Sequence, residues 1–175
     1  MLPLSFEFFP PKTDEQRETL HRSVQRLRSH SPDYVSVTFG AGGSTLSYTY
    51  STVAELKTAH GLDVAPHLSC MGGTAAEIRE LLQRYVDLGV RRLVALRGDM
   101  PSGMATAGEF RYAIDLVRFV RAEFGAHFHI EVACYPECHP QARDAREDLR
   151  HFASKMEAGA DGAITQYFFN ADAFE

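Results

Sequence analysis

Residues 5–11 read SFEFFPP, and this stretch decides between two possible folds. It predicts a short strand with Phe6 and Phe8 on one face and Glu7 on the other, because side chains alternate along a strand. Pro10 and Pro11 end the strand, since proline cannot donate a hydrogen bond to a sheet. A carboxylate among such neighbours is either a partly exposed glutamate of an edge strand or a general acid whose raised pKa keeps it protonated near neutral pH.

Outward from this strand, the hydrophobic patterns alternate between strand and helix along the whole chain. Further strands are predicted at residues 34–39, 64–70, 92–96, 128–135 and 163–169. Helices are predicted at residues 13–28, 47–60, 74–88, 110–124 and 142–158. Regular alternation of this kind is typical of a parallel sheet with right-handed crossover connections.

Two architectures have this alternation, an open doubly wound sheet and a closed barrel. A dinucleotide-binding doubly wound sheet needs a glycine-rich turn after its first strand, and here the turn reads Pro-Pro-Lys at residues 10–12. We therefore predict an α/β fold, a (β/α)8 barrel of the TIM type, to which the chain contributes six strands and five helices. Because a closed barrel takes about 250 residues, we expect residues 1–175 to be one barrel domain that stops before its last strands.

Composition restricts the possible partners. Lys and Arg total 18 and Asp and Glu total 23, a net charge of −5 with no basic run, so we expect neither nucleic acid nor a membrane surface as partner. We find no apolar run of membrane-spanning length and no signal-peptide pattern. An odd number of cysteines (Cys70, Cys134 and Cys138) then predicts free thiols in the cytoplasm. The spacing of the last two and His139 matches no zinc motif, and no metal is expected.

Polar side chains gather late in the predicted strands. They are Glu7, Thr38, His67, Arg97, Asp99, Tyr135, His139 and Gln166. Any one of them could be an ordinary polar group of the core, but the carboxyl ends of parallel strands meet at one edge of the sheet. Their convergence there predicts a ligand crevice.

A second polar group lies on the last predicted helix. Asp148, His151 and Lys155 are three and four residues apart and therefore share one face of that helix. The face is either a solvated stripe with a weak Asp–Lys pair or a surface that contacts the ribose and diphosphate of a cofactor.

Six motifs carry a family resemblance. They are SFEFFPP at 5–11, VSVTFG at 35–40, PHLSC at 66–70, ALRGD at 95–99, YPECHP at 135–140 and ITQYFF at 164–169. In this order and at this spacing they resemble bacterial methylenetetrahydrofolate reductase. The resemblance implies a flavin barrel that passes hydride from NADH or NADPH through FAD to 5,10-methylenetetrahydrofolate and forms 5-methyltetrahydrofolate, the methyl donor for methionine synthesis.

The resemblance also assigns residues. It implies that Glu7 is the proton donor and that Asp99 acts beside the flavin. The positions that match flavin contacts are Phe39, Ala41, His67, Arg97, Gly98, Asp99, Ala113, Tyr135, His139, Ala142, Asp148, His151 and Lys155. Thr38 and Gln166 match positions near the nicotinamide, and Gln166 also matches a pterin contact.

Two departures from the family pattern lie on the last helix. His151 stands where an amide is usual, and Ser154 where a basic residue is common, so we expect a weaker hold on the diphosphate. Folate and a nicotinamide nucleotide are the expected partners, and we expect a homo-oligomer. The alternatives are another FAD barrel, such as a proline dehydrogenase-like oxidase, and an inactive barrel fragment.

Overall fold

The computed structural model describes residues 3–39, 45–70, 73–98 and 108–174. Its strands are β1 (Ser5–Phe8), β2 (Tyr34–Val37), β3 (Val64–Ser69), β4 (Arg92–Leu96), β5 (His129–Cys134) and β6 (Gly162–Thr165). Its α-helices are α1 (Asp14–Leu27), α2 (Thr45–Thr58), α3 (Ala75–Asp87), α4 (Ala113–Phe124) and α5 (Ala145–Glu157), with short 3-10 helices at Arg28–His30 and Ala171–Ala173.

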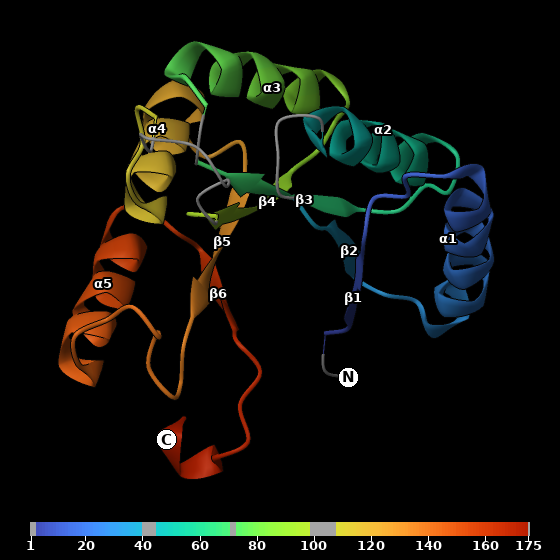
Figure 1. The fold of residues 1–175 in the computed structure, drawn as a ribbon. Coiled ribbons are helices and arrows are strands. Elements are labelled where there is room, and N and C mark those ends of the chain that lie inside the picture. Colours follow the sequence, from blue (N-terminus) through green and yellow to red (C-terminus); the bar gives the residue numbers. More distant parts are fainter. Residues whose placement is uncertain (1–2, 40–44, 71–72, 99–107, 175) are drawn as a thin grey trace.

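The six strands form one parallel sheet in the order β1-β2-β3-β4-β5-β6. The sheet curls into an arch, and the five helices lie along its convex side (Figure 1). A doubly wound sheet would reverse its strand order at a switch point, whereas here each strand pairs with the next one in sequence. The predicted barrel-type α/β fold is therefore confirmed for the described part of the chain.

The hydrophobic core lies between the sheet and the helices. Alternate strand residues, such as Phe8, Val37 and Leu68, are buried against helix residues such as Val24 and Leu82. Residues of the opposite parity, Glu7 among them, therefore face the concave side of the arch. Packing of one strand face against the helices thus fixes which side chains reach the concave side.

Helix ends agree with the sequence where a capping motif is present. The Thr13 side chain accepts a hydrogen bond from the Gln16 backbone N–H at the start of α1. Thr74 and Glu77 form a capping box at the start of α3. Gly125 follows α4 with a φ of 55°, a conformation that glycine adopts without steric cost.

Several predicted bounds are wrong by a few residues. β2 ends at Val37 rather than at residue 39, and β6 ends at Thr165 rather than at residue 169. α5 begins at Ala145 rather than at residue 142, because the Asp144 side chain caps it by accepting from the Glu147 N–H. On the same helix, the apolar side chain of Leu149 is not buried, since 66% of Leu149 is exposed.

The concave side also carries polar bonds near the amino ends of the strands. The Tyr34 hydroxyl donates to Glu131 Oε2 at 2.9 Å, which links β2 to β5. Arg92 Nε donates to Asp63 Oδ2 at 3.1 Å, and its guanidinium lies 4.9 Å from the centre of the Tyr34 ring. In barrels this end of the sheet serves stability, and these bonds hold non-adjacent strands together across the arch.

Two further findings concern membrane-spanning helices and the cysteines. Among the described residues, no helix combines the length and apolar character needed to cross a bilayer. Cys70, Cys134 and Cys138 are all free thiols, as predicted.

Candidate functional site

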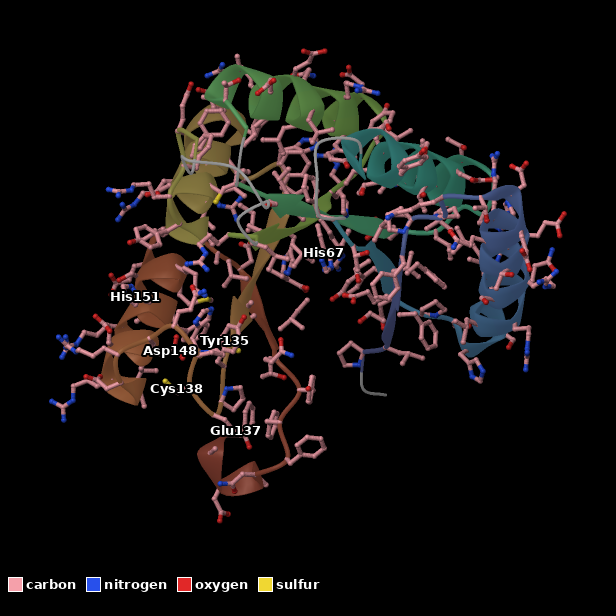
Figure 2. All side chains as sticks on the ribbon, in the orientation of Figure 1. His67, Tyr135, Glu137, Cys138, Asp148 and His151 are labelled. Carbon is pink, nitrogen blue, oxygen red and sulfur yellow. The ribbon has the colours of Figure 1, made fainter. Side chains whose placement is uncertain are left out.

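Glu7 lies in a three-residue polar cluster on the concave side of the arch. Its Oε2 atom is 3.2 Å from His67 Nε2, and it accepts a hydrogen bond from Ser36 Oγ at 3.4 Å. The sheet register explains the cluster, since Glu7 pairs with Ser36 on the neighbouring strand and β3 lies beside that strand. Figure 2 shows His67 on the concave side. Three successive strands thus bring a carboxylate, a hydroxyl and an imidazole together.

The pKa of Glu7 is not raised, as it would be for a general acid that stays protonated near neutral pH. The contact with His67 lowers the pKa of Glu7 below 4.5, and this effect exceeds the opposing effect of burial. Half of the carboxyl side chain is exposed, whereas 12% of the His67 side chain is exposed. The expectation of a raised pKa is therefore wrong for this protein, because the effect of the nearby His67 imidazole outweighs partial desolvation.

His67 Nε2 is buried and has no well-aligned hydrogen bond among the described residues, although it lies within ion-pair distance of Glu7. The two observations are compatible, because an ion pair tolerates an oblique approach that a hydrogen bond does not. A buried ring nitrogen of this kind at the concave face is available to a ligand.

The loop between β5 and α5 forms a second group of contacts. The Tyr135 and His139 rings meet edge to face with centroids 4.5 Å apart. The His139 N–H donates to Asp148 Oδ2 at 2.9 Å, which connects the loop to α5. Cys138 has a φ of 82°, a sterically costly conformation for a residue with a Cβ. Figure 2 shows Tyr135, Cys138 and Asp148 near one another beside α5.

Arg97 joins this loop to the end of β4. Its Nη2 donates to Gln141 Oε1 at 2.5 Å. Its backbone oxygen accepts hydrogen bonds from Ser69 Oγ at 3.0 Å and from the Cys70 thiol at 3.4 Å. These bonds hold the carboxyl ends of β3 and β4 and the β5–α5 loop in a fixed relation.

Lys155 points toward the sheet rather than into solvent. Its Nζ donates to the Ala133 carbonyl of β5 at 2.5 Å. Burial lowers the pKa of Lys155, while the nearby Asp148 acts in the opposite direction. The stripe on α5 is therefore split, because Asp148 and Lys155 contact β5 and its loop whereas His151 is exposed. An ordinary solvated stripe does not describe this face.

The other predicted site residues are placed as follows. The Thr38 N–H donates to the Phe8 carbonyl at 3.0 Å, and the Gln166 N–H donates to the Cys134 carbonyl at 2.8 Å. Both residues thus sit just beyond strand ends. Phe39 and Gly98 lie just beyond β2 and β4, Ala113 is the first residue of α4, and Ala142 lies in the β5–α5 loop. Ala41 and Asp99 lie outside the described residues.

Ser36 and Gln141 contact predicted site residues through their side chains but were not themselves predicted as site residues. Ser36 has the parity of Glu7 and follows the same register, so strand alternation could have identified it. Gln141 carries no signal in the sequence, since its contact with Arg97 depends on the path of a loop. Within the described ranges, no three His, Cys, Asp or Glu side chains are grouped so as to hold a metal ion.

Comparison with known proteins gives a consistent result. The family model described as methylenetetrahydrofolate reductase matches residues 2–175. The chain is 44% identical over 171 residues to "5,10-methylenetetrahydrofolate reductase" of Salmonella typhimurium, covering 98% of this chain and 56% of that protein. It is 37% identical to "Probable methylenetetrahydrofolate reductase (NADH)" of Oryza sativa, covering 97% of this chain and 31% of that protein.

The fold comparison agrees with the barrel architecture. A crystal structure of 2,3-dimethylmalate lyase superimposes with a TM-score of 0.61 at 13% identity, over 82% of this chain and 54% of that one. At this identity the likeness concerns the fold alone. The chain spans about half the length of the bacterial relative that it matches.

Proposed function

The chain belongs to the methylenetetrahydrofolate reductase family, and from this premise we propose that it is part of an enzyme that reduces 5,10-methylenetetrahydrofolate to 5-methyltetrahydrofolate with NADH or NADPH. The observation that carries the proposal is the meeting of Glu7, Ser36 and His67 on the concave face of a chain that the family model matches from residue 2 to residue 175. The name of the rice relative includes NADH, which favours NADH as the donor.

FAD is the proposed cofactor, and it would supply a carrier that accepts hydride from one substrate and gives it to the other. The described residues fit such a group. His67 Nε2 is buried without an aligned hydrogen bond, and the β5–α5 loop presents the Tyr135 and His139 rings beside Asp148 and Lys155. A cation such as Lys155 suits a diphosphate, an acidic side chain such as Asp148 suits the hydroxyls of a ribose, and the two rings suit a flat heterocycle.

The proposed flavin-binding residues belong to β3, α4 and α5 and to the segments that follow β2, β4 and β5 in the sequence. They are Phe39, Ala41, His67, Arg97, Gly98, Asp99, Ala113, Tyr135, His139, Ala142, Asp148, His151 and Lys155. Arg97 fixes the loop through Gln141, so it would orient the His139 region before the cofactor arrives. A carboxylate at Asp99 would disfavour extra negative charge on the flavin and so favour donation of hydride.

Glu7 is the proposed proton donor. Hydride can reach the methylene carbon once the five-membered ring of the folate opens, and opening requires a proton on the departing nitrogen. In the ligand-free protein the contact with His67 keeps Glu7 ionised near neutral pH. A bound substrate that excludes water and weakens this contact would raise the pKa of Glu7, which allows the carboxyl to be protonated where the proton is needed.

Thr38 and Gln166 are the proposed contacts for the nicotinamide and the pterin. The Thr38 backbone is bonded to Phe8 at the end of β1, and the Gln166 backbone is bonded to Cys134 at the end of β5. Their side chains would therefore lie at the carboxyl ends of the strands. We further propose a cytoplasmic homo-oligomer, in keeping with free thiols and a net charge of −5.

The test is the visible spectrum of the purified full-length protein. The expected result is a yellow protein that releases FAD on denaturation, is bleached by NADH without air, and is reoxidised by added methylenetetrahydrofolate. A colourless protein that takes up no added FAD would contradict the flavin proposal. A yellow protein whose bleached form ignores folate but reacts with proline would indicate a different flavin enzyme.

A further inference from the structure

His67 is the buried member of the polar cluster on the concave face. On β3 it pairs with the apolar Val94 of β4, whereas its contact with Glu7 reaches across β2 to β1. His67 Nε2 lies 3.2 Å from Glu7 Oε2, and 12% of the His67 side chain is exposed against 49% of the Glu7 side chain. One buried ring nitrogen thus faces a carboxylate that is open to water, on the face where a cofactor would lie.

The Nε2 atom of His67 can serve only one strong partner at a time. An imidazole nitrogen carries either one hydrogen or one lone pair in the plane of the ring. Here the atom is buried and makes no aligned hydrogen bond among the described residues, so its contact with Glu7 depends on proximity rather than on good alignment. A ligand atom that offers an aligned bond to Nε2 would therefore take this nitrogen from Glu7.

Glu7 would change its charge once it lost this partner. Among the described residues, the groups that shift the pKa of Glu7 are His67, which has the largest effect and lowers it, and Ser36, which has the smallest effect and also lowers it. Burial acts in the opposite direction. With His67 engaged elsewhere, burial is opposed only by Ser36 Oγ at 3.4 Å, and a ring laid over the carboxyl would add to the burial. The protonated form of Glu7 is then favoured.

We propose that His67 couples occupancy of the flavin site to protonation of Glu7: a flavin atom that bonds to His67 Nε2 frees the Glu7 carboxylate, which then takes up a proton. The inference rests on the proposed function, because it takes FAD as the occupant. The carbonyl oxygens and ring nitrogens of a flavin suit an imidazole nitrogen as hydrogen-bond partners. The proton comes from water, and an O–H bond forms on Glu7. The cofactor thus prepares the general acid before folate enters.

The experiment is an NMR titration of the Glu7 carboxyl carbon in the full-length protein, once after removal of FAD and once loaded with FAD. Glu7→Gln assigns the signal, because the variant lacks it. The expected result is a pKa below 4.5 without FAD and a pKa about 1–3 pH units higher with FAD, the usual size of the effect that a nearby opposite charge exerts. Folate is left out of both samples, so the difference belongs to the cofactor.

His67→Ala tests whether the histidine carries the coupling. The variant has no Nε2 atom for either partner, so the pKa of Glu7 should already be raised without FAD, and loading should change it much less than in the wild type. Ser36→Ala is the matched control, because it removes the other contact of Glu7 and keeps His67, and loading should raise the pKa in it as in the wild type. Circular dichroism checks that each variant is folded, and flavin absorbance checks that each sample is loaded.

The pKa values separate this coupling from its alternatives. An unchanged pKa on loading the wild type would overturn the coupling while leaving flavin binding intact, and it does so even if His67→Ala takes up no FAD. An equal rise in the wild type and in His67→Ala would overturn it too, because exclusion of water would then be the cause. A rise that appears only after folate is added would make the substrate the trigger instead. A full-length protein that binds no FAD would overturn the proposed function, and this inference with it.

Discussion

Glu7 owes its position to its own strand and its charge to a residue on another strand. Alternation along β1 places the side chain on the concave face, and the neighbouring Ser36 follows from the parallel register. The lowered pKa comes mainly from His67 on β3, and that proximity depends on the curl of the sheet. A donor that is ionised at rest and protonated with substrate bound would couple proton supply to binding.

The first prediction concerns Glu7→Gln. Glutamine keeps the size and hydrogen bonding of the side chain but cannot deliver a proton. Reduction of folate by the full-length, FAD-loaded protein should fall by about 10²–10⁴-fold, the usual contribution of general acid catalysis, while bleaching by NADH should change little. Stopped-flow absorbance measures each half-reaction separately. Equal loss in both would mean that Glu7 supports the cofactor site, and no loss in either would identify another donor.

The second prediction concerns His67→Ala and pH. Because the folded pKa of Glu7 is lowered, Glu7 adds stability above pH about 4.5 that is lost as the pH falls through the folded pKa. Without His67 the pKa should rise, and less stability should be lost between pH 5 and pH 3. NMR titration of the Glu7 carboxyl carbon in the FAD-free protein measures the pKa directly. Ser36→Ala removes the smaller contact and should raise the pKa less. An unchanged pKa in His67→Ala would contradict the assigned cause.

At the scale of the element, α5 shows how a helix can be predicted correctly while its environment is not. Its existence follows from the spacing of Phe152 and Met156, which do pack against the core. Leu149 continues the same pattern but is exposed, because no described segment covers that part of the helix. Instead, Lys155 contacts β5 and Asp148 contacts the β5–α5 loop, and these bonds help to fix the position of α5.

The third prediction tests this face of α5 with Lys155→Ala. A charge-assisted contact to a phosphate is worth about 1–3 kcal/mol, so the variant should bind FAD roughly 5–150-fold more weakly. Arg150→Ala is the control, since Arg150 is an exposed cation of the same helix and should leave the affinity unchanged. Quenching of FAD fluorescence gives both constants. If Lys155→Ala binds FAD as the wild type does, the lysine serves only to hold α5 against the Ala133 carbonyl.

At the scale of the whole molecule, the described arch has two strand edges, on β1 and on β6. Large apolar side chains are exposed near both, including Phe9 at 75%, Tyr167 at 75% and Phe169 at 91%. Unpaired strand edges beside exposed aromatic rings are a ready surface for association with other chains.

The fourth prediction follows from these edges. The 175-residue chain, expressed alone, should associate or be poorly soluble, and size-exclusion chromatography with light scattering measures its mass. Replacing Tyr167 and Phe169 together with lysine should reduce association, because charge on an edge opposes strand pairing. The matched control replaces Glu18 and Arg22 on α1, an exposed i,i+4 pair away from the edges, with alanine. A monodisperse monomer of the unaltered chain would contradict the prediction.

The sequence by itself determined the order and type of the elements, the parallel sheet and the family. These features follow from local information, namely hydrophobic period, proline and glycine positions and capping residues, and six short motifs in a fixed order. Strand parity also assigned Glu7 to the face opposite Phe6 and Phe8 before any contact was known, because alternation is a property of the strand. Several strand ends and the starts of α4 and α5 were predicted less accurately.

Only the tertiary structure decided which polar residues touch and what charge they carry. The contact between Glu7 and His67 requires three strands to curl together. This contact lowers the pKa of Glu7, whereas burial alone would raise it. Lys155 and Asp148 share a helix face in the sequence, but their bonds to β5 and its loop depend on how α5 packs. Side-chain charge depends on distances between segments far apart in the chain, and those distances exist only once the chain has folded.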